Sequence, residues 1–141
     1  MVILDTNVIS EVVRPKPESA VISWLGAQPR TTLYITTITR GELLYGAEIL
    51  PEGERRIQLK QQLQTILDQE FSGQILPFDN RAANQFALIA AKRRQQGMPI
   101  SQFDAMIAAI ARSHEAKLAT RNTRDFIECG IELINPWESI N

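Results

Sequence analysis

The chain has 141 residues, which suits a single domain with a sizeable hydrophobic core, and we expect residues 1–141 to form one domain. A formal net charge of −1 excludes nucleic-acid binding driven by overall positive charge, so any such contact must depend on a local patch. With one cysteine, no signal peptide and no apolar run of about 20 residues, the sequence predicts a cytoplasmic protein without disulfides or a membrane segment.

Apolar spacing, β-branched residues and helix-ending prolines predict an alternation of strands and helices. In chain order these are a strand at 2–4, helices at 7–13 and 18–27, a strand at 33–37, helices at 40–50 and 54–71, a strand at 74–78, helices at 80–96 and 101–115, and strands at 117–120 and 131–134. The first strand is apolar without alternation, as in parallel strands buried on both faces. We therefore expect an α/β fold with a parallel sheet and right-handed crossovers.

Four acidic residues lie near the carboxyl ends of these predicted strands. Asp5 directly follows the first strand, and Asp125 lies in the loop after the fourth. Glu42 follows the second strand by a short turn, while Asp104 lies in the first turn of the helix before the fourth strand. Because the carboxyl ends of parallel strands meet at one edge of a sheet, we expect these side chains to gather there.

Helix capping is the competing interpretation of the same residues. Asp5 or Asn7 suits an N-cap, residues 39–42 match the capping box S/T-x-x-E, and residues 101–104 are a close variant of it. Capping does not explain why the acids collect at one end of one sheet.

A cluster of carboxylates requires a positive charge, because like charges that share a site repel one another. The chain has one histidine and one cysteine, so it offers no compact set of zinc ligands. Oxygen ligands favour a hard cation, Mg²⁺ or Mn²⁺. Metal-assisted cleavage of a phosphodiester bond is the chemistry that this pattern favours.

The same residues resemble the motifs of PIN-domain ribonucleases, in particular the VapC-type toxins of VapBC toxin–antitoxin modules. The four matching segments are VILDTNVIS at 2–10, ITRGEL at 38–43, DAMIA at 104–108 and TRNTRDF at 120–126. The ending INPW at 134–137 is similar to the FitB-like branch, and the resemblance covers essentially the whole chain.

This resemblance implies a single-domain three-layer sandwich with a five-stranded parallel sheet. It also implies an endoribonuclease that depends on Mg²⁺ or Mn²⁺ and is inhibited by a cognate antitoxin. The family forms homodimers, which assemble with antitoxin into heterotetramers or hetero-octamers and then bind operator DNA. The substrate would be RNA.

By the same resemblance, Asp5, Glu42 and Asp104 are catalytic residues and metal ligands. The fourth acid of the family can stand where this chain has Asn122. Two alternatives therefore remain: Asp125 supplies the fourth charge, or Asn122 binds the metal or one of its waters through the amide oxygen.

Several nearby residues have both a functional and a structural interpretation. Thr6 either hydrogen-bonds within the site or starts a helix, and Ser101 supports the site as an N-cap. Arg121 and Arg124 flank the site and are candidates for RNA contact. Residues 92–94, Lys-Arg-Arg, either bind RNA phosphates or occupy the last turn of a helix.

Two rival classes of protein are considered. A phospho-accepting receiver domain would need a lysine after the fifth strand, but residues 131–141 contain none, and Asp79 is better explained as a helix N-cap. A non-catalytic PIN-like binding module, or a DNA-associated regulator acting with an antitoxin, would be favoured by loss of one or more of Asp5, Glu42 and Asp104, and none of these three is lost. We also expect a homodimer, because some apolar helix residues exceed what one sheet can cover: Ile22, Trp24, Leu25, Leu43, Leu44 and Tyr45.

Overall fold

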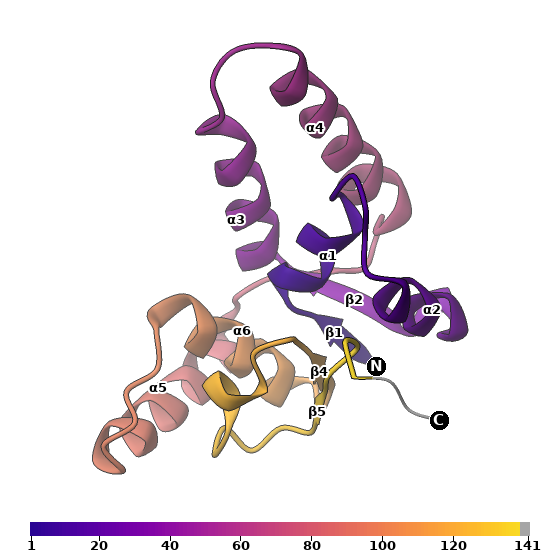
Figure 1. Ribbon diagram of the computed structural model, residues 1–141. Coiled ribbons are helices and arrows are strands. Elements are labelled where there is room, and N and C mark those ends of the chain that lie inside the picture. The colour runs from indigo at the N-terminus through magenta and orange to yellow at the C-terminus, as the bar shows by residue number, and fades with distance from the viewer. Residues whose placement is uncertain (139–141) are drawn as a thin grey trace.

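A parallel sheet lies between two layers of helices in the computed structural model, which describes residues 1–138 (Figure 1). The strands are β1 (Val2–Leu4), β2 (Leu33–Thr36), β3 (Ile75–Leu76), β4 (Lys117–Ala119) and β5 (Leu133–Ile134), in the order β3-β2-β1-β4-β5. All four pairings are parallel. The predicted α/β class, the five strands and the three layers are confirmed. The end of the predicted domain, residues 139–141, lies outside the described residues.

The helices divide between the two faces of the sheet. One layer holds α1 (Thr6–Val12), α2 (Ser19–Ala27), α3 (Thr37–Glu48) and α4 (Glu54–Thr65), and the other holds α5 (Asn80–Gln95) and α6 (Gln102–Ser113), as Figure 1 shows. The central strand contributes side chains to both faces of the sheet: Val2 and Leu4 pack into one hydrophobic core, and Ile3 packs into the other. None of the helices in the described part of the chain is long and apolar enough to cross a bilayer.

Helix α3 begins at Thr37, directly after β2 and earlier than the predicted start at residue 40. The reason is an N-cap at Thr36, whose buried side chain accepts a 3.1 Å hydrogen bond from the Thr39 amide. Thr39 therefore lies inside the helix and is not its cap. The capping-box interpretation of residues 39–42 is wrong, and Glu42 lies beyond the first turn.

The predicted helix over 54–71 is an α-helix only as far as Thr65. Residues Ile66–Glu70 form a π-helical turn that follows it directly. The amide of Phe71 donates to the carbonyl of Ile66 at 2.9 Å. This wider turn brings Ile66, Leu67 and Phe71 into the core, where all three are buried.

Other helix boundaries follow the sequence closely. Asp79 caps α5 by accepting from the Ala82 amide, and Ser101 caps α6 by accepting from the Asp104 amide. Gly97 adopts φ +71 just after α5, a conformation that favours glycine.

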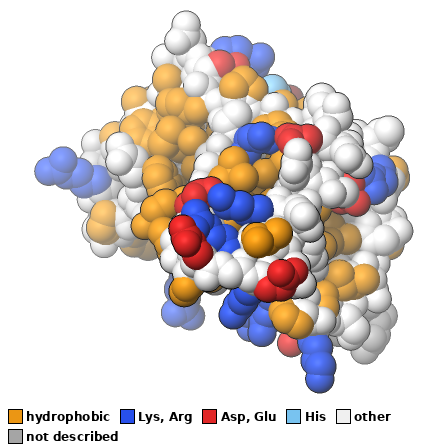
Figure 2. All heavy atoms as spheres, turned by 90° about the horizontal axis from the view of Figure 1, so that it is seen from above, with side chains coloured by type: hydrophobic (Ala, Val, Ile, Leu, Met, Phe, Trp, Pro, Cys, Tyr) orange, Lys and Arg blue, Asp and Glu red, His pale blue; other side chains and the backbone are white. Residues whose placement is uncertain are grey.

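The apolar residues expected at a dimer interface fall into two groups. Leu43 belongs to the core, and Trp24 and Leu25 pack against it. Ile22, Leu44 and Tyr45 are exposed. Figure 2, which views the molecule from the end bearing the α3–α4 connection, shows hydrophobic side chains gathered beside a cluster of mixed charges.

Candidate active site

Asp5 lies at the carboxyl end of the central strand, with 5% of its surface exposed. It is the N-cap of α1, since its Oδ1 accepts a 2.8 Å hydrogen bond from the Thr6 amide. Its Oδ2 accepts a 2.7 Å bond from the Thr120 hydroxyl, which follows β4. Capping and membership of an acidic site are therefore compatible, because each carboxylate oxygen keeps a further lone pair.

Burial raises the pKa of the Asp5 carboxyl from 3.8 to about 6. The hydrogen bonds from Thr120 and Thr6 act in the opposite direction, while the charges of Asp104 and Glu42 raise the pKa further. The ionised carboxylate is thus held in surroundings that disfavour it. A nearby cation would offset this cost.

Glu42 is half-buried on α3 and is tied to α1 through Thr6. The Thr6 hydroxyl donates a 2.7 Å hydrogen bond to Glu42 Oε1 and lies 2.9 Å from the hydroxyl oxygen of the buried Thr39. Thr6 therefore orients one acid with its side chain and a second, Asp5, with its backbone amide.

Asp104 is half-buried in the first turn of α6. Burial is the largest cause of its raised pKa, and the charge of Asp125 adds to it. Ser101 and the charge of Arg93 lower the pKa. Because Asp104 also acts electrostatically on Asp5, the four acids form one electrostatic neighbourhood at the carboxyl edge of the sheet.

Asn122 and Asp125 are both exposed on the loop after β4. The Asn122 amide donates to Thr120 Oγ1 at 3.1 Å, and the Asp125 amide donates to the Asn122 carbonyl at 3.0 Å. Asn122 precedes the short 3₁₀ helix Thr123–Phe126, which carries Asp125. The fold thus brings both residues to the loop that borders the site.

The two candidate RNA-binding arginines are exposed, and Arg121 contacts two neighbouring residues. Its amide nitrogen lies 3.4 Å from Asn7 Oδ1, and its guanidinium lies 5.4 Å from the centre of the Trp137 ring. This stacking fixes a cation beside the loop that carries Asn122.

Thr120 and Arg93 bond to residues of the acidic cluster, Asp5 and Asp125, in ways that the sequence analysis did not predict. A signal for Thr120 exists, because Leu4 pairs with Ala119 and the next residue on each strand, Asp5 and Thr120, must then be neighbours. Residues 92–94 occupy the last turn of α5, as one of the two interpretations expected. Arg93 is buried on the inward face of this helix with Ala82 and Ile89, so the interpretation that it binds RNA phosphates is wrong. Lys92 and Arg94 are exposed.

The donor set fits a hard divalent cation. It consists of carboxylates with an adjacent amide and hydroxyls, and the buried Asp5 lies among like charges. Within residues 1–138, however, no three Asp, Glu, His or Cys side chains are already grouped tightly enough to hold an ion.

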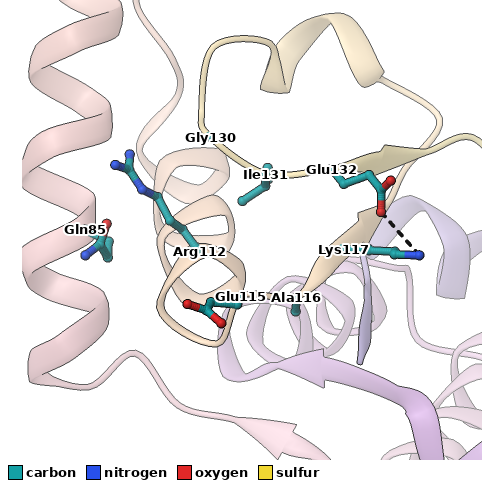
Figure 3. A pocket seen from close by; sticks show the side chains of 8 residues that line it. All are labelled: Gln85, Arg112, Glu115, Ala116, Lys117, Gly130, Ile131 and Glu132. Atoms are coloured by element: carbon teal, nitrogen blue, oxygen red, sulfur yellow. Dashed lines mark ion pairs between the residues drawn. The ribbon is translucent and has the colours of Figure 1, made fainter.

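Two hollows lie at opposite ends of the strands. One of about 700 Å³ borders Glu42 and has apolar walls that include Tyr45 and Phe103. The other, of about 510 Å³, lies beside Lys117 at the amino end of β4, where Lys117 pairs with Glu132 at 3.3 Å (Figure 3). The second pocket contains none of the predicted site residues.

Residues 2–131 match the PIN domain family, and the chain belongs to that family. It is 40% identical over 138 residues to the VapC ribonuclease Y4jK of Sinorhizobium fredii, covering 98% of this chain and 99% of the relative. It is 37% identical over 137 residues to the toxin FitB of Neisseria gonorrhoeae, covering 97% and 99%. The structure of FitAB bound to an IR36 DNA fragment matches with a TM-score of 0.94 and 35% identity, covering 100% of this chain and 99% of that one. The predicted resemblance is confirmed.

Proposed function

We propose that this protein is a divalent-metal-dependent endoribonuclease and the toxin of a toxin–antitoxin pair. The observation that carries the proposal is the buried Asp5, placed at the end of the central strand within the electrostatic reach of Glu42 and Asp104. Its full-length likeness to a VapC ribonuclease and to the FitB toxin supports the reaction class. The presence of Asp5, Glu42 and Asp104 favours catalysis over a non-catalytic binding module.

Asp5, Glu42 and Asp104 would hold Mg²⁺ or Mn²⁺, with Asp125 or Asn122 completing the site. The ion would polarise the scissile phosphate, favour deprotonation of the attacking water and stabilise the leaving oxygen. The protein's own contribution is orientation: the Thr6 hydroxyl restrains Glu42, and the Thr120 hydroxyl restrains Asp5. Arg121 and Arg124 would bind the phosphates of the RNA strand that lies across the site.

We further infer that the protein forms homodimers and binds a cognate antitoxin, and that the complex binds operator DNA. The similar structure contains FitAB on a DNA fragment. The exposed apolar side chains of Leu44, Tyr45 and Ile49 on and next to α3 supply surface for a protein partner.

The test is cleavage of a mixed RNA substrate by the purified protein in Mg²⁺, in Mn²⁺ and in EDTA. We expect cleavage with either metal and none in EDTA. End-labelling of the products should detect 5′-phosphates and 3′-hydroxyls. Undiminished cleavage in EDTA would contradict the metal-dependent mechanism, and a folded protein without ribonuclease activity would favour the binding-module alternative.

A further inference from the structure

Arg93 connects the two chain segments that carry Asp104 and Asp125. It lies in the last turn of α5 with 5% of its surface exposed. Its Nε donates to the Met98 carbonyl at 2.7 Å, and its Nη1 donates to the carbonyls of Asp125 at 2.8 Å and Ile127 at 3.0 Å. Met98 lies in the connection to α6, whose first turn bears Asp104. One guanidinium therefore bonds to both segments.

The chemistry of the guanidinium makes this connection rigid. Its N–H groups lie in one plane and point in fixed directions, so bonds on two sides determine the relative position of the two partners. Asp125 contributes its own carbonyl oxygen and is therefore held at its backbone. Asp104 is held less directly, through the Met98 connection and the Ser101 cap.

Burial of this cation is costly, which argues against a purely space-filling role. Within residues 1–138 Arg93 forms no ion pair, and its bonding partners are three carbonyl oxygens and, at 3.6 Å, the Cys129 sulfur. Its charge nevertheless acts on the site, because it lowers the pKa of Asp104 against the stronger effect of burial.

We propose that Arg93 is a positioning residue, which holds Asp104 and Asp125 in place so that both can bind the same divalent cation. The inference rests on the proposed function. Arg93 contacts neither the cation nor the RNA, so its effect passes through the two carboxylates. Within residues 1–138 the exposed Lys92 reaches the same loop only through an ion pair with Glu128 at 3.4 Å, and it bonds to the backbone of neither Asp125 nor Met98.

Arg81, which is exposed, provides a control on the same helix. Like Arg93, it extends from α5 and donates to a backbone carbonyl, in this case that of Ser113 at 2.8 Å. Arg81 lies in the first turn of α5, and Ser113 is the last residue of α6. Its substitution removes a connection between α5 and α6 at the ends of these helices that are remote from Asp104.

The experiment compares R93Q, R93K and R81Q with the full-length wild type. Mn²⁺ affinity is measured by isothermal titration calorimetry and stability by urea unfolding. We expect R93Q to bind Mn²⁺ about 10- to 100-fold more weakly, the range found for residues that orient metal ligands. R93K should lose less, because it keeps the charge without the planar fork. R81Q should lose stability but bind Mn²⁺ as the wild type does.

A readout without metal completes the test. Amide hydrogen exchange in the metal-free protein should be faster at Asp104 in R93Q and unchanged there in R81Q. Wild-type Mn²⁺ affinity in folded R93Q, or equal losses in R93Q and R81Q, would overturn the proposal. If R93Q does not fold, wild-type affinity in R93K would overturn it. If the wild type itself neither binds Mn²⁺ nor cleaves RNA, the proposed function fails, and unchanged exchange at Asp104 then refutes the role of Arg93 separately.

Discussion

The Thr120 hydroxyl, which follows β4, donates a 2.7 Å hydrogen bond to Oδ2 of Asp5, which follows the neighbouring strand β1. The same oxygen accepts from the Asn122 amide at 3.1 Å and from Asn7 Nδ2 at 3.3 Å. A single buried hydroxyl thus orients the central carboxylate and fixes the start of the loop that carries Asp125.

Thr120→Val should keep the shape of this side chain but remove all three hydrogen bonds. Since buried polar groups would lose their partners, we expect a loss of about 1–3 kcal/mol in the free energy of unfolding. Thr120→Ser keeps the hydroxyl and should lose less than half as much. Urea unfolding in EDTA measures both variants, and equal stability of Thr120→Val and wild type would show that the hydroxyl does not organise the site.

Asp5→Asn should stabilise the metal-free protein at neutral pH. Because the folded state raises the Asp5 pKa from 3.8 to about 6, it holds the proton more tightly than the unfolded chain does. The free energy of unfolding therefore falls as the pH rises from about 4 to about 6, by about 3 kcal/mol in all. Asparagine carries no charge and avoids this cost. Its amino group cannot accept the hydrogen bond from the Thr120 hydroxyl, however, and this loss lowers the free energy of unfolding by about 1 kcal/mol.

We therefore expect Asp5→Asn to be about 2 kcal/mol more stable than wild type at pH 7.5 in EDTA, with the advantage gone near pH 4. Mn²⁺ should reverse the order, because a ligand at 100 times its dissociation constant stabilises by about 2.7 kcal/mol. Urea unfolding at three pH values, with EDTA and with Mn²⁺, measures both effects. Equal gains from Mn²⁺ in both proteins would mean that Asp5 is only a helix cap.

Asp104→Asn should abolish metal-dependent RNA cleavage in a folded protein. The substitution removes a charge from the site, while the Ser101 cap, which accepts from the backbone amide of residue 104, remains. Asp79→Asn is the matched control, since Asp79 caps α5 and asparagine caps helices equally well. Cleavage rates and circular dichroism check both variants. Wild-type cleavage by Asp104→Asn would contradict the mechanism.

Asp125→Ala should impair RNA cleavage and Mn²⁺ affinity more than Asn122→Ala. A full negative charge binds a hard cation better than a neutral amide does, and Asp125 acts electrostatically on Asp104. Calorimetric titration with Mn²⁺ gives the comparison. A larger loss in Asn122→Ala would transfer the fourth position to the amide oxygen.

Tyr45→Glu should disrupt a homodimer. Tyr45 is 65% exposed on α3, beside Leu44 at 38%, whereas their neighbour Leu43 is already buried. A charge placed in an apolar interface loses its hydration without a partner. Light scattering at micromolar concentration should give a dimer for wild type and a monomer for the variant, while the matched substitution Gln58→Glu on exposed α4 should leave the dimer intact. A monomeric wild type would rule out this interface.

The sequence predicts those site residues whose role depends on their immediate neighbours in the chain, but not the contacts between residues that are distant in the sequence. Asp5 is identifiable because it follows a strand whose apolar residues show no alternation, and Ser101 because its cap is local. Glu42 was expected in a first turn, but the Thr36 cap moves the start of α3 toward the amino terminus. The bond from Thr6 to Glu42 joins residues distant in the sequence, so it depends on the packing of α1 against α3. The buried state of Arg93 likewise depends on the loop that covers it.

The position of β1 at the centre of the sheet has a consequence for protein synthesis. Asp5 is made well before its hydrogen-bond partner Thr120, which lies 115 positions later. The parallel pairing of Val2 with Lys117 cannot form until the intervening helices exist. A ribosome that stops before β4 therefore releases a chain with an unsupported Asp5 and no complete acidic site. The acidic site can therefore assemble only after β4, the second neighbour of β1, has been made.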